Sequence, residues 1–558
     1  MSDTTEINSS LSAIKQQPES HLAVAENSEM PRKDVDTLLG FLGRPGRYQI
    51  IAFFLLAFMH IPFAYNSLAM IFLGGRPSGS HCGGTEVNIS RPEDLPGCRT
   101  MMMFTSDGEV TSCMKPSAAW TNTSSKPGFC NNCSLQYDFH LPSETTIVSE
   151  FDLICENYWL TSMGTTIYFV GCMFGGALIG LISDAKGRKT AILVATLLLI
   201  GSGFGVTFAP NIWVFLVFRF LVGCFMQGAD LTAFTLLMET FSGRYREFAG
   251  VSAQLMWVSG VISLAGIAYG LPNWRNLQLF ITIVPVIVLP CLLFVKESIR
   301  WLYVSQKFEE AKSATASILK FNNLPKSKKV SDCENYLVLW YQKEDDDSLE
   351  KDGGYSTWNL FSSPQLRKRI LGLMYIWFVA SLWYYVISFA ITDLFGEKHV
   401  NVAIAGSLEL PATLLTMVAT KRFGCRRPLI WTCAITAVLS IIAGSLPTST
   451  TTYAIIRTVF AQFARGGTHA LFNAMLPYAS DLMPTVVRNK GLGVCSFAMR
   501  LGGVLAPQLL LLGTYTSPEV PFVLCGILGL GGAAVTYILP ETRGVRLPET
   551  VEDIMSPS

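Results

Sequence analysis

The chain has 558 residues, of which half are hydrophobic and only 15% are charged, and its formal net charge is +1. This composition is typical of a membrane protein and excludes a soluble enzyme of this length. A net charge so close to zero gives no support for a nucleic-acid partner.

Residues 1–45 are polar and are expected to form a cytoplasmic tail. They lack the apolar core of a signal peptide, so the first long apolar stretch is predicted to remain as an anchor. Since roughly 20 apolar residues cross a bilayer as a helix, about twelve spans are predicted. They are expected near 50–73, 160–183, 190–208, 212–236, 248–270, 277–295, 370–394, 402–420, 428–446, 453–476, 490–513 and 520–539.

The segment 74–158, between the first two spans, is long and rich in cysteine. Its cysteines are Cys82, Cys98, Cys113, Cys130, Cys133 and Cys155. An even number of cysteines outside the cytoplasm indicates a disulfide framework, whose pairing stays open. The same segment carries N-x-S/T glycosylation motifs at Asn88, Asn122 and Asn132. A metal site is disfavoured, because no C-x-x-C is matched by a second cysteine or histidine pair at zinc-finger spacing.

Basic residues indicate the orientation. Lys and Arg collect after the second, fourth, eighth and tenth spans, for example at Lys186, Arg246, Lys421 and Lys490. Cytoplasmic loops carry this excess of positive charge. With an even number of spans, both termini are therefore expected in the cytoplasm, and 74–158 is expected to be an extracellular, glycosylated loop of a plasma-membrane protein.

A long polar segment divides the spans into two sets of six. The expected organisation is an N-terminal bundle over 46–296, a cytoplasmic linker over 297–369, a C-terminal bundle over 370–539 and a cytoplasmic tail over 540–558. Within the linker, an amphipathic pattern predicts a helix near 308–319. The acidic run at 344–347 is interpreted as a solvated surface.

The two halves repeat each other. The sequence GLISDAKGRK (180–189) corresponds to KRFGCRR (421–427), and KESIRW (296–301) corresponds to PETRG (540–544). Glu239 precedes Arg246 by seven residues, as Asp481 precedes Arg488. Three matches in the same order at nearly one offset predict a duplicated six-helix unit. The predicted fold is an all-α membrane protein with twelve transmembrane helices in two six-helix bundles.

The repeated loop motifs predict electrostatic gates. Asp184 follows a span beside a Gly-Arg-Lys cluster, where its carboxylate can pair with basic residues and a helix N-terminus. Such contacts are expected to hold the halves together on the cytoplasmic side and to break when that side opens. A purely topogenic role for the basic residues would leave Asp184 unexplained. The candidate gating residues are Asp184, Arg188, Glu239, Arg246, Asp481 and Arg488.

Several ionisable residues lie within predicted spans, where a charge costs roughly 2.5–3.5 kcal/mol unless it faces a partner or a cavity. Arg219 and Asp230 are eleven residues apart and share one helix face. Arg465, His469 and Asn473 follow at four-residue intervals and form a polar stripe. His469 could couple protons, although a lone histidine more often only forms hydrogen bonds. Glu409 and Arg500 complete a set that draws on both halves.

The chain resembles the organic cation, carnitine and organic anion transporter family of the major facilitator superfamily. The resemblance covers about residues 40–550 and rests on the cysteine-rich loop and on FDLIC (151–155), SDAKGRK (183–189), FRFLVG (218–223), SPQLRKRILGLMYIWF (363–378), DLMPTVVRNKGLGVCS (481–496) and LPETRGVRLPET (539–550). Two departures concern the gate: VKESIRWL lacks the usual prolines, and Lys421 stands where an acidic residue is common.

The resemblance implies a central cavity with defined lining residues. Those that match family cavity positions are Gln254, Trp377, Tyr384, Glu409 and Asn473. Asp230 stands where cation-transporting relatives often have an aromatic residue. Arg500 stands where those relatives have aspartate and where anion and carnitine transporters have arginine. With Tyr385 and Arg465, these residues form the candidate substrate site.

A guanidinium such as that of Arg500 favours a carboxylate, sulfate or phosphate group. Asp230 could bind an amine, aided by cation–π contact with Tyr384, Tyr385, Trp383 or Trp377. The predicted function is plasma-membrane transport of small organic ions (zwitterions, organic anions or polar amines) by alternating access, as a uniporter or exchanger.

Three alternatives stay open. One is an amine-selective transporter that uses Asp230 and Glu409, with Arg500 locked in a structural pair. The second is a receptor or scaffold with the same fold, and the third is a channel, for which no ring of pore-lining residues is evident.

Enzymatic activity, a cofactor and ATP-driven pumping are disfavoured, because no phosphate-binding loop, nucleophile elbow or metal-ligand set is present. The expected partners are the organic ion and membrane lipids; the oligomeric state stays open.

Overall fold

A computed structural model describes residues 45–75, 80–82, 101–104, 110–114, 137–139, 145–153, 157–241, 243–322, 360–361, 363–447, 450–484 and 487–543. The predicted glycosylation sites Asn88, Asn122 and Asn132 and the cysteines Cys98, Cys130, Cys133 and Cys155 lie outside these residues. Cys82 and Cys113 lie in short strands. The glycosylation and disulfide assignments therefore stay predictions.

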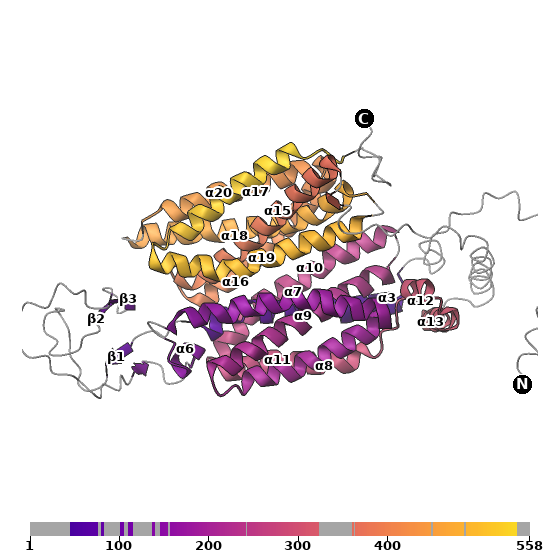
Figure 1. The fold of residues 1–558 in the computed structure, drawn as a ribbon, viewed down its shortest axis with the longest axis horizontal. Helices are drawn as coiled ribbons and strands as arrows, with labels where there is room; N and C mark the ends of the chain where they lie inside the picture. Colours follow the sequence, from indigo (N-terminus) through magenta and orange to yellow (C-terminus); the bar gives the residue numbers. More distant parts are fainter. Residues whose placement is uncertain are drawn as a thin grey trace, which may run out of the picture.

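The described chain consists mainly of long helices in two bundles (Figure 1). The first bundle contains α3 (Arg47–Ala57), α4 (His60–Leu68), α5 (Met70–Leu73), α7 (Trp159–Lys186), α8 (Arg188–Thr207), α9 (Ile212–Thr240), α10 (Gly243–Gly270) and α11 (Trp274–Leu292). The second contains α15 (Pro364–Ala390), α16 (Lys398–Phe423), α17 (Arg426–Ser445), α18 (Thr451–Leu482), α19 (Arg488–Tyr515) and α20 (Val520–Ile538).

Smaller elements mark the two ends of the bundles. At one end, here called the linker end, lie α12 (Ile299–Val304) and α13 (Phe308–Phe321) (Figure 1). At the opposite end, the strand end, lie α6 (Ile147–Glu150) and four short strands. A short 3₁₀ helix, η6 (Ile391–Asp393), follows α15. The helix predicted near 308–319 is α13.

The strands form two separate antiparallel pairs. β1 (Ser80–Cys82) pairs with β4 (Tyr137–Phe139), and β2 (Met101–Phe104) pairs with β3 (Val110–Met114). The sequence pattern gives no signal for these strands. Strands of three to five residues carry too little pattern to be distinguished from loop, and they leave the helical fold class unchanged.

Eleven helical segments of the described chain are long and apolar enough to cross a membrane, with α3 to α5 counted as one. The segment α18, at 32 residues, makes the twelfth long helix, but it is less apolar because it carries Arg457, Arg465 and His469. The twelve predicted spans are therefore confirmed as helices, and α18 is the one that carries the predicted polar stripe.

The first span is interrupted in its middle. Pro62 has no N–H group for a helical hydrogen bond, and just before it Met59 N bonds to Leu56 O at 3.2 Å and Ile61 N to Phe58 O at 3.0 Å. These tighter turns separate α3 from α4 and are typical of a helix kink. His60 stands at this break.

The bundles meet through α7 against α19 and α10 against α16. At the strand end, the ring of His399 stacks on Phe72 at 5.2 Å and meets Tyr269 edge-on at 5.6 Å. Nearer the middle, Gln508 Nε2 donates to Thr166 Oγ1 at 2.8 Å. These contacts all join one bundle to the other between the strand end and the middle.

Backbone geometry supports the internal repeat. The turns from α7 to α8 and from α16 to α17 each contain a glycine with positive φ, +103° at Gly187 and +82° at Gly424. Only glycine adopts this conformation without strain. Arg246 Nε donates to Phe241 O and Arg488 donates to Met483 O, five residues back in both cases. Equivalent residues therefore make equivalent contacts in the two halves.

Candidate functional site

Charged and polar side chains converge at similar depth from several helices. Depth can be counted from the linker-end residue of each helix. His60 lies thirteen residues after Arg47, the first residue of α3. Asp230 lies ten residues before Thr240, the last of α9, and Arg500 lies twelve residues after Arg488, the first of α19. Since a helix rises about 1.5 Å per residue, all three lie roughly 15–20 Å from the linker end. This is near the middle of a hydrocarbon core about 30 Å thick.

The second bundle contains a fully buried ion pair. Arg465 on α18 donates to Glu409 Oε1 on α16 at 2.9 Å, and both side chains have 0% exposure. Tyr384 on α15 joins them, because its hydroxyl donates to Glu409 at 3.0 Å and accepts from Arg465 at 2.8 Å. The Arg465 guanidinium also lies 4.7 Å from the centre of the Tyr384 ring. Glu409 is thus compensated within its own bundle.

The predicted polar stripe continues from this pair along α18. His469 Nδ1 lies 3.5 Å from Glu409 Oε2, and its Nε2 lies 3.1 Å from Thr413 Oγ1. Asn473 Nδ2 donates to the same Thr413 hydroxyl at 3.1 Å. Arg465, His469 and Asn473 therefore share one face, directed at α16, as their spacing predicts.

A hydrogen bond links this cluster to the first bundle. Trp257 Nε1 on α10 donates to the Tyr384 hydroxyl at 3.2 Å. Tyr385 makes a second bridge, because its ring lies 4.4 Å from that of Phe169 on α7. Closure between the bundles is thus connected directly to the buried charges.

Replacing Trp257 with phenylalanine is expected to weaken this closure by about 0.5–1.5 kcal/mol, the net value of one hydrogen bond. Hydrogen–deuterium exchange should then become faster in α5, α10 and α16 at the strand end. Tyr375→Phe is the matched control, because the Tyr375 hydroxyl bonds to Leu528 O within the second bundle. Equal exchange in the two variants would contradict a role for Trp257 in joining the bundles.

Arg219 on α9 is buried in the first bundle at 0% exposure. It donates to Asn66 O at 3.2 Å, and its guanidinium lies 4.8 Å from the centre of the Tyr168 ring. Arg219 and Asp230 come from one helix, as predicted, but they do not pair with each other. The Asn66 carbonyl and the face of the Tyr168 ring contact the Arg219 guanidinium instead.

Asp230 has a partner that the sequence analysis missed. His60 Nδ1 on α4 lies 3.5 Å from Asp230 Oδ1, and both residues are buried. The edge of Phe234 covers the histidine, with ring centres 5.9 Å apart. The sequence feature that could have indicated this partner is His60 itself, a histidine two residues before Pro62 in an otherwise apolar span.

Arg500 on α19 is half-buried and forms no ion pair within the described part of the chain. Its guanidinium lies 5.8 Å from the centre of the Phe63 ring on α4 of the opposite bundle. Gln254 and Asn473 are also half-buried, whereas Trp377 is buried and its indole N–H has no hydrogen-bond acceptor. Polar groups from both bundles thus remain available at this depth.

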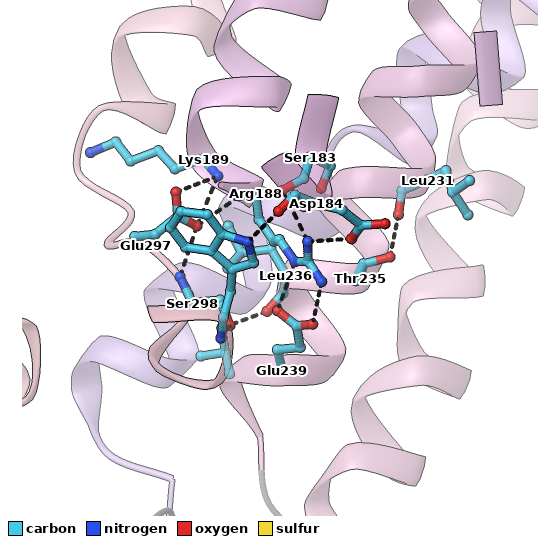
Figure 2. A network of polar contacts seen from close by, with 12 residues as sticks. Ser183, Asp184, Arg188, Lys189, Leu231, Thr235, Leu236, Glu239, Glu297 and Ser298 are labelled. Carbon is cyan, nitrogen blue, oxygen red and sulfur yellow. Dashed lines mark hydrogen bonds and ion pairs between the residues drawn. The ribbon is translucent and has the colours of Figure 1, made fainter. Parts of the chain in front are cut away.

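A separate polar network lies at the linker end (Figure 2). Arg188 donates to Asp184 at 2.6 Å and to both Glu239 oxygens at 3.3 and 3.4 Å. Glu297 accepts from the main-chain N–H groups of Arg188 and Lys189 at 2.9 and 3.1 Å. Because Gly187 at the helix start has no side chain, Glu297 caps α8 in its place.

The described contacts of the candidate gating residues leave the gate a prediction, since contacts between the halves are expected there only while the cytoplasmic side is closed. The contacts of Asp184, Arg188 and Glu239 join α7, α8 and α9 within the first bundle, and do not join the two halves. Arg246 and Arg488 likewise bond to carbonyls in their own bundles. The bundles meet through their strand-end half, so the linker-end network holds each half together internally.

The equivalent position in the second bundle is chemically different. The Cys425 thiol lies where Arg188 lies in the first half, with its sulfur 4.0 Å from Asp481 Oδ2. Burial, with the Asp481 and Glu541 carboxylates nearby, raises the pKa of the Cys425 thiol to about 11. The thiol is therefore neutral near pH 7, and this half lacks the charge that Arg188 provides.

Two related six-helix bundles with buried charges at middle depth define a membrane transporter of the major facilitator type. The family model for "Sugar (and other) transporter" matches residues 103–553. The chain therefore belongs to this family and, as the sequence motifs predict, to its organic cation, carnitine and organic anion transporter branch.

Relatives and solved structures agree with this assignment. The chain is 30% identical to solute carrier family 22 member 3 of Mus musculus, over 93% of this chain and 95% of the relative. It is 30% identical to organic anion transporter 3 of Oryctolagus cuniculus (93% and 93%) and 28% identical to an organic cation transporter protein of Drosophila melanogaster (93% and 94%). The fold is similar to the inward-open xylose transporter XylE of E. coli, with a TM-score of 0.60 at 15% identity over 90% of this chain and 98% of that one.

Proposed function

We propose that this protein carries small organic anions and zwitterions across the plasma membrane by alternating access. Arg500 is the residue proposed to bind the anionic group of the substrate. The observation that supports this role most directly is that Arg500 is half-buried at middle depth and forms no ion pair within the described chain. A guanidinium in this state offers paired donors to a carboxylate or sulfonate.

The amine-selective alternative has weaker support. Glu409 is fully buried and already bound to Arg465 and Tyr384, so it offers no free charge to an amine. The Asp230 side chain is 10% exposed and lies against His60. The names of the relatives include both organic anion and organic cation transporters, so family membership alone does not decide between the classes.

The proposed orientation places the linker end in the cytoplasm, following the excess of basic residues there. Contacts between the bundles in the strand-end half then correspond to an inward-facing state. Residues Gln254, Trp377, Tyr384, Tyr385 and Asn473 are proposed to line the path with Arg500. The linker 297–369 and both tails are proposed to be cytoplasmic.

Substituting Arg500 with glutamine is expected to lower kcat/KM for anion uptake about 10–100-fold, the loss for a charge-assisted hydrogen bond worth roughly 1.5–3 kcal/mol. Arg500→Lys is expected to recover part of it, because lysine keeps the charge without the planar fork. Uptake of labelled aryl sulfonate, carnitine and a quaternary amine would be measured in cells with equal surface expression.

Arg427→Gln serves as the matched control, because it removes the same charge from an exposed position at the linker end. Unchanged anion uptake in Arg500→Gln would contradict the proposed role of Arg500. A wild-type protein without saturable flux of any probe would instead support a receptor or scaffold.

A further inference from the structure

The pair formed by His60 and Asp230 differs from the other mid-depth pair in one respect. Glu409 is neutralised by Arg465, whose guanidinium keeps its proton at any physiological pH. Among the described residues of its own bundle, the ion-pair partner of Asp230 is the imidazole of His60. Unlike a guanidinium, an imidazole is a type of group that can exchange a proton near neutral pH. His469 also lies 3.5 Å from Glu409, but that carboxylate already has the Arg465 guanidinium as its counter-charge. Asp230 has no such guanidinium among the described residues of its own bundle.

The pair is buried and carries unused hydrogen-bonding capacity. His60 is 5% and Asp230 is 7% exposed. At 3.5 Å, His60 Nδ1 and Asp230 Oδ1 are close enough for charge interaction, yet neither atom has a hydrogen-bond partner in the described chain. Such atoms are costly to leave unsatisfied, and a shared proton between them would satisfy both.

Charged and titratable groups surround this pair from both bundles. On α7, which packs against α9, the buried Tyr168 and Cys172 both interact with Arg219, and Cys172 also interacts with Arg500. Across the bundle interface, Arg500 interacts electrostatically with Asp230. Arg500 also lies over Phe63, one helical turn along α4 from His60. From α9, the nearest other charge along the chain is Glu239, which binds Arg188 at the linker end. From α11, Arg275 is held by Glu150 at the strand end.

Charge balance links this pair to the anion site. Without substrate, the positive Arg500 offsets the negative Asp230 while His60 is neutral. A bound anion pairs with Arg500 and leaves Asp230 uncompensated at middle depth, which is costly. One proton added between His60 and Asp230 restores neutrality. Anion and proton therefore favour each other's binding, and this coupling is reciprocal.

We infer that His60 and Asp230 form a proton-binding site and that the protein moves one proton together with each monovalent organic anion. This inference rests on the proposed function of Arg500. In the cycle, the proton enters the His60 and Asp230 site from the side on which the anion binds Arg500, and it leaves on the opposite side with the anion. The bond that forms on proton entry and breaks on release is the N–H or O–H bond to the carried proton, and the transported pair is electrically neutral.

The test uses the full-length protein in liposomes that contain a pH-sensitive dye, with radiolabelled toluenesulfonate as the anion. A sulfonate stays ionised near neutral pH, so any proton that enters cannot be carried by the probe itself. The exterior is held at about pH 6 and the interior at about pH 7.5, a range over which histidine titrates. Probe and proton uptake are measured together in wild type, His60→Gln and Asp230→Asn.

Wild type is expected to take up about one proton per sulfonate and to accelerate with the inward proton gradient. Both variants should still bind the probe, as seen by its effect on thermal unfolding, but the proton ratio should fall to about zero. His469→Gln is the matched control: it removes the other mid-depth histidine and should keep the wild-type ratio.

Sulfonate uptake without proton uptake in wild type would overturn the proton site but leave anion transport intact. An unchanged ratio in His60→Gln and Asp230→Asn would overturn the assignment to these residues. If wild type transports no anion, or if Arg500→Gln transports it normally, the proposed function itself fails.

Discussion

Replacing Arg465 with methionine is expected to destabilise the protein by about 3–5 kcal/mol, the cost of removing one partner of a buried ion pair. Glu409 would remain at 0% exposure without its guanidinium partner, with the Tyr384 hydroxyl as a hydrogen-bond donor and His469 Nδ1 at 3.5 Å. The variant should reach the cell surface poorly. In detergent, its midpoint of thermal unfolding should fall well below that of wild type.

Removing both charges should restore much of the loss. In the double variant Arg465→Met and Glu409→Gln, no buried charge is left uncompensated, and such replacements are often neutral or stabilising. The three variants and wild type form a double-mutant cycle that isolates the coupling between the two residues. A double variant as unstable as Arg465→Met alone would show that the ion pair is not the source of the stability.

The same cycle distinguishes the substrate classes. If Glu409 only neutralises Arg465, the double variant should transport organic anions at a rate near that of wild type. If Glu409 binds the amine of a cationic substrate, uptake of that substrate should disappear even though the fold is restored. Transport by the Arg465 and Glu409 variants therefore tests whether the Glu409 carboxylate is available to a substrate.

The fold could be predicted from the sequence because its main signals are local. Runs of about 20 apolar residues identify spans, and the seven-residue spacing shared by Glu239 with Arg246 and by Asp481 with Arg488 revealed the repeat. The stripe of Arg465, His469 and Asn473 also follows from helical periodicity. These features depend on residues close together in the chain.

The partners of the charges could not be predicted in this way. Helical spacing placed Arg219 and Asp230 on one helix face, but it could not reveal that Arg219 would bind Asn66 O and that Asp230 would face His60. Those contacts depend on how the first span breaks between α3 and α4 and on how α4 packs against α9. The contacts within the linker-end network could not be predicted for a similar reason, since a loop motif does not specify which helices its neighbours come from.

Introducing leucine at Gly175 is expected to prevent stable packing of the first bundle. A Cβ atom at Gly175 on α7 would overlap the main chain of Cys224 on α9, and the same holds for Gly171 against Phe220. Small residues of this kind let two membrane helices approach closely. A main chain cannot move aside as a side chain can, so the cost should reach or exceed the roughly 1–3 kcal/mol typical of overpacking.

This close approach also positions the buried charges, because α9 carries Arg219 and Asp230 while α7 carries Tyr168, which covers the Arg219 guanidinium. Gly180→Leu is the matched control on the same helix, where a Cβ would meet nothing within 4 Å. Thermal unfolding and surface expression should be strongly impaired by Gly175→Leu and little affected by Gly180→Leu. Equal effects at the two positions would show that contact with α9 does not determine whether α7 accepts leucine. That result would contradict the proposal that the close packing of α7 and α9 positions Arg219 and Asp230.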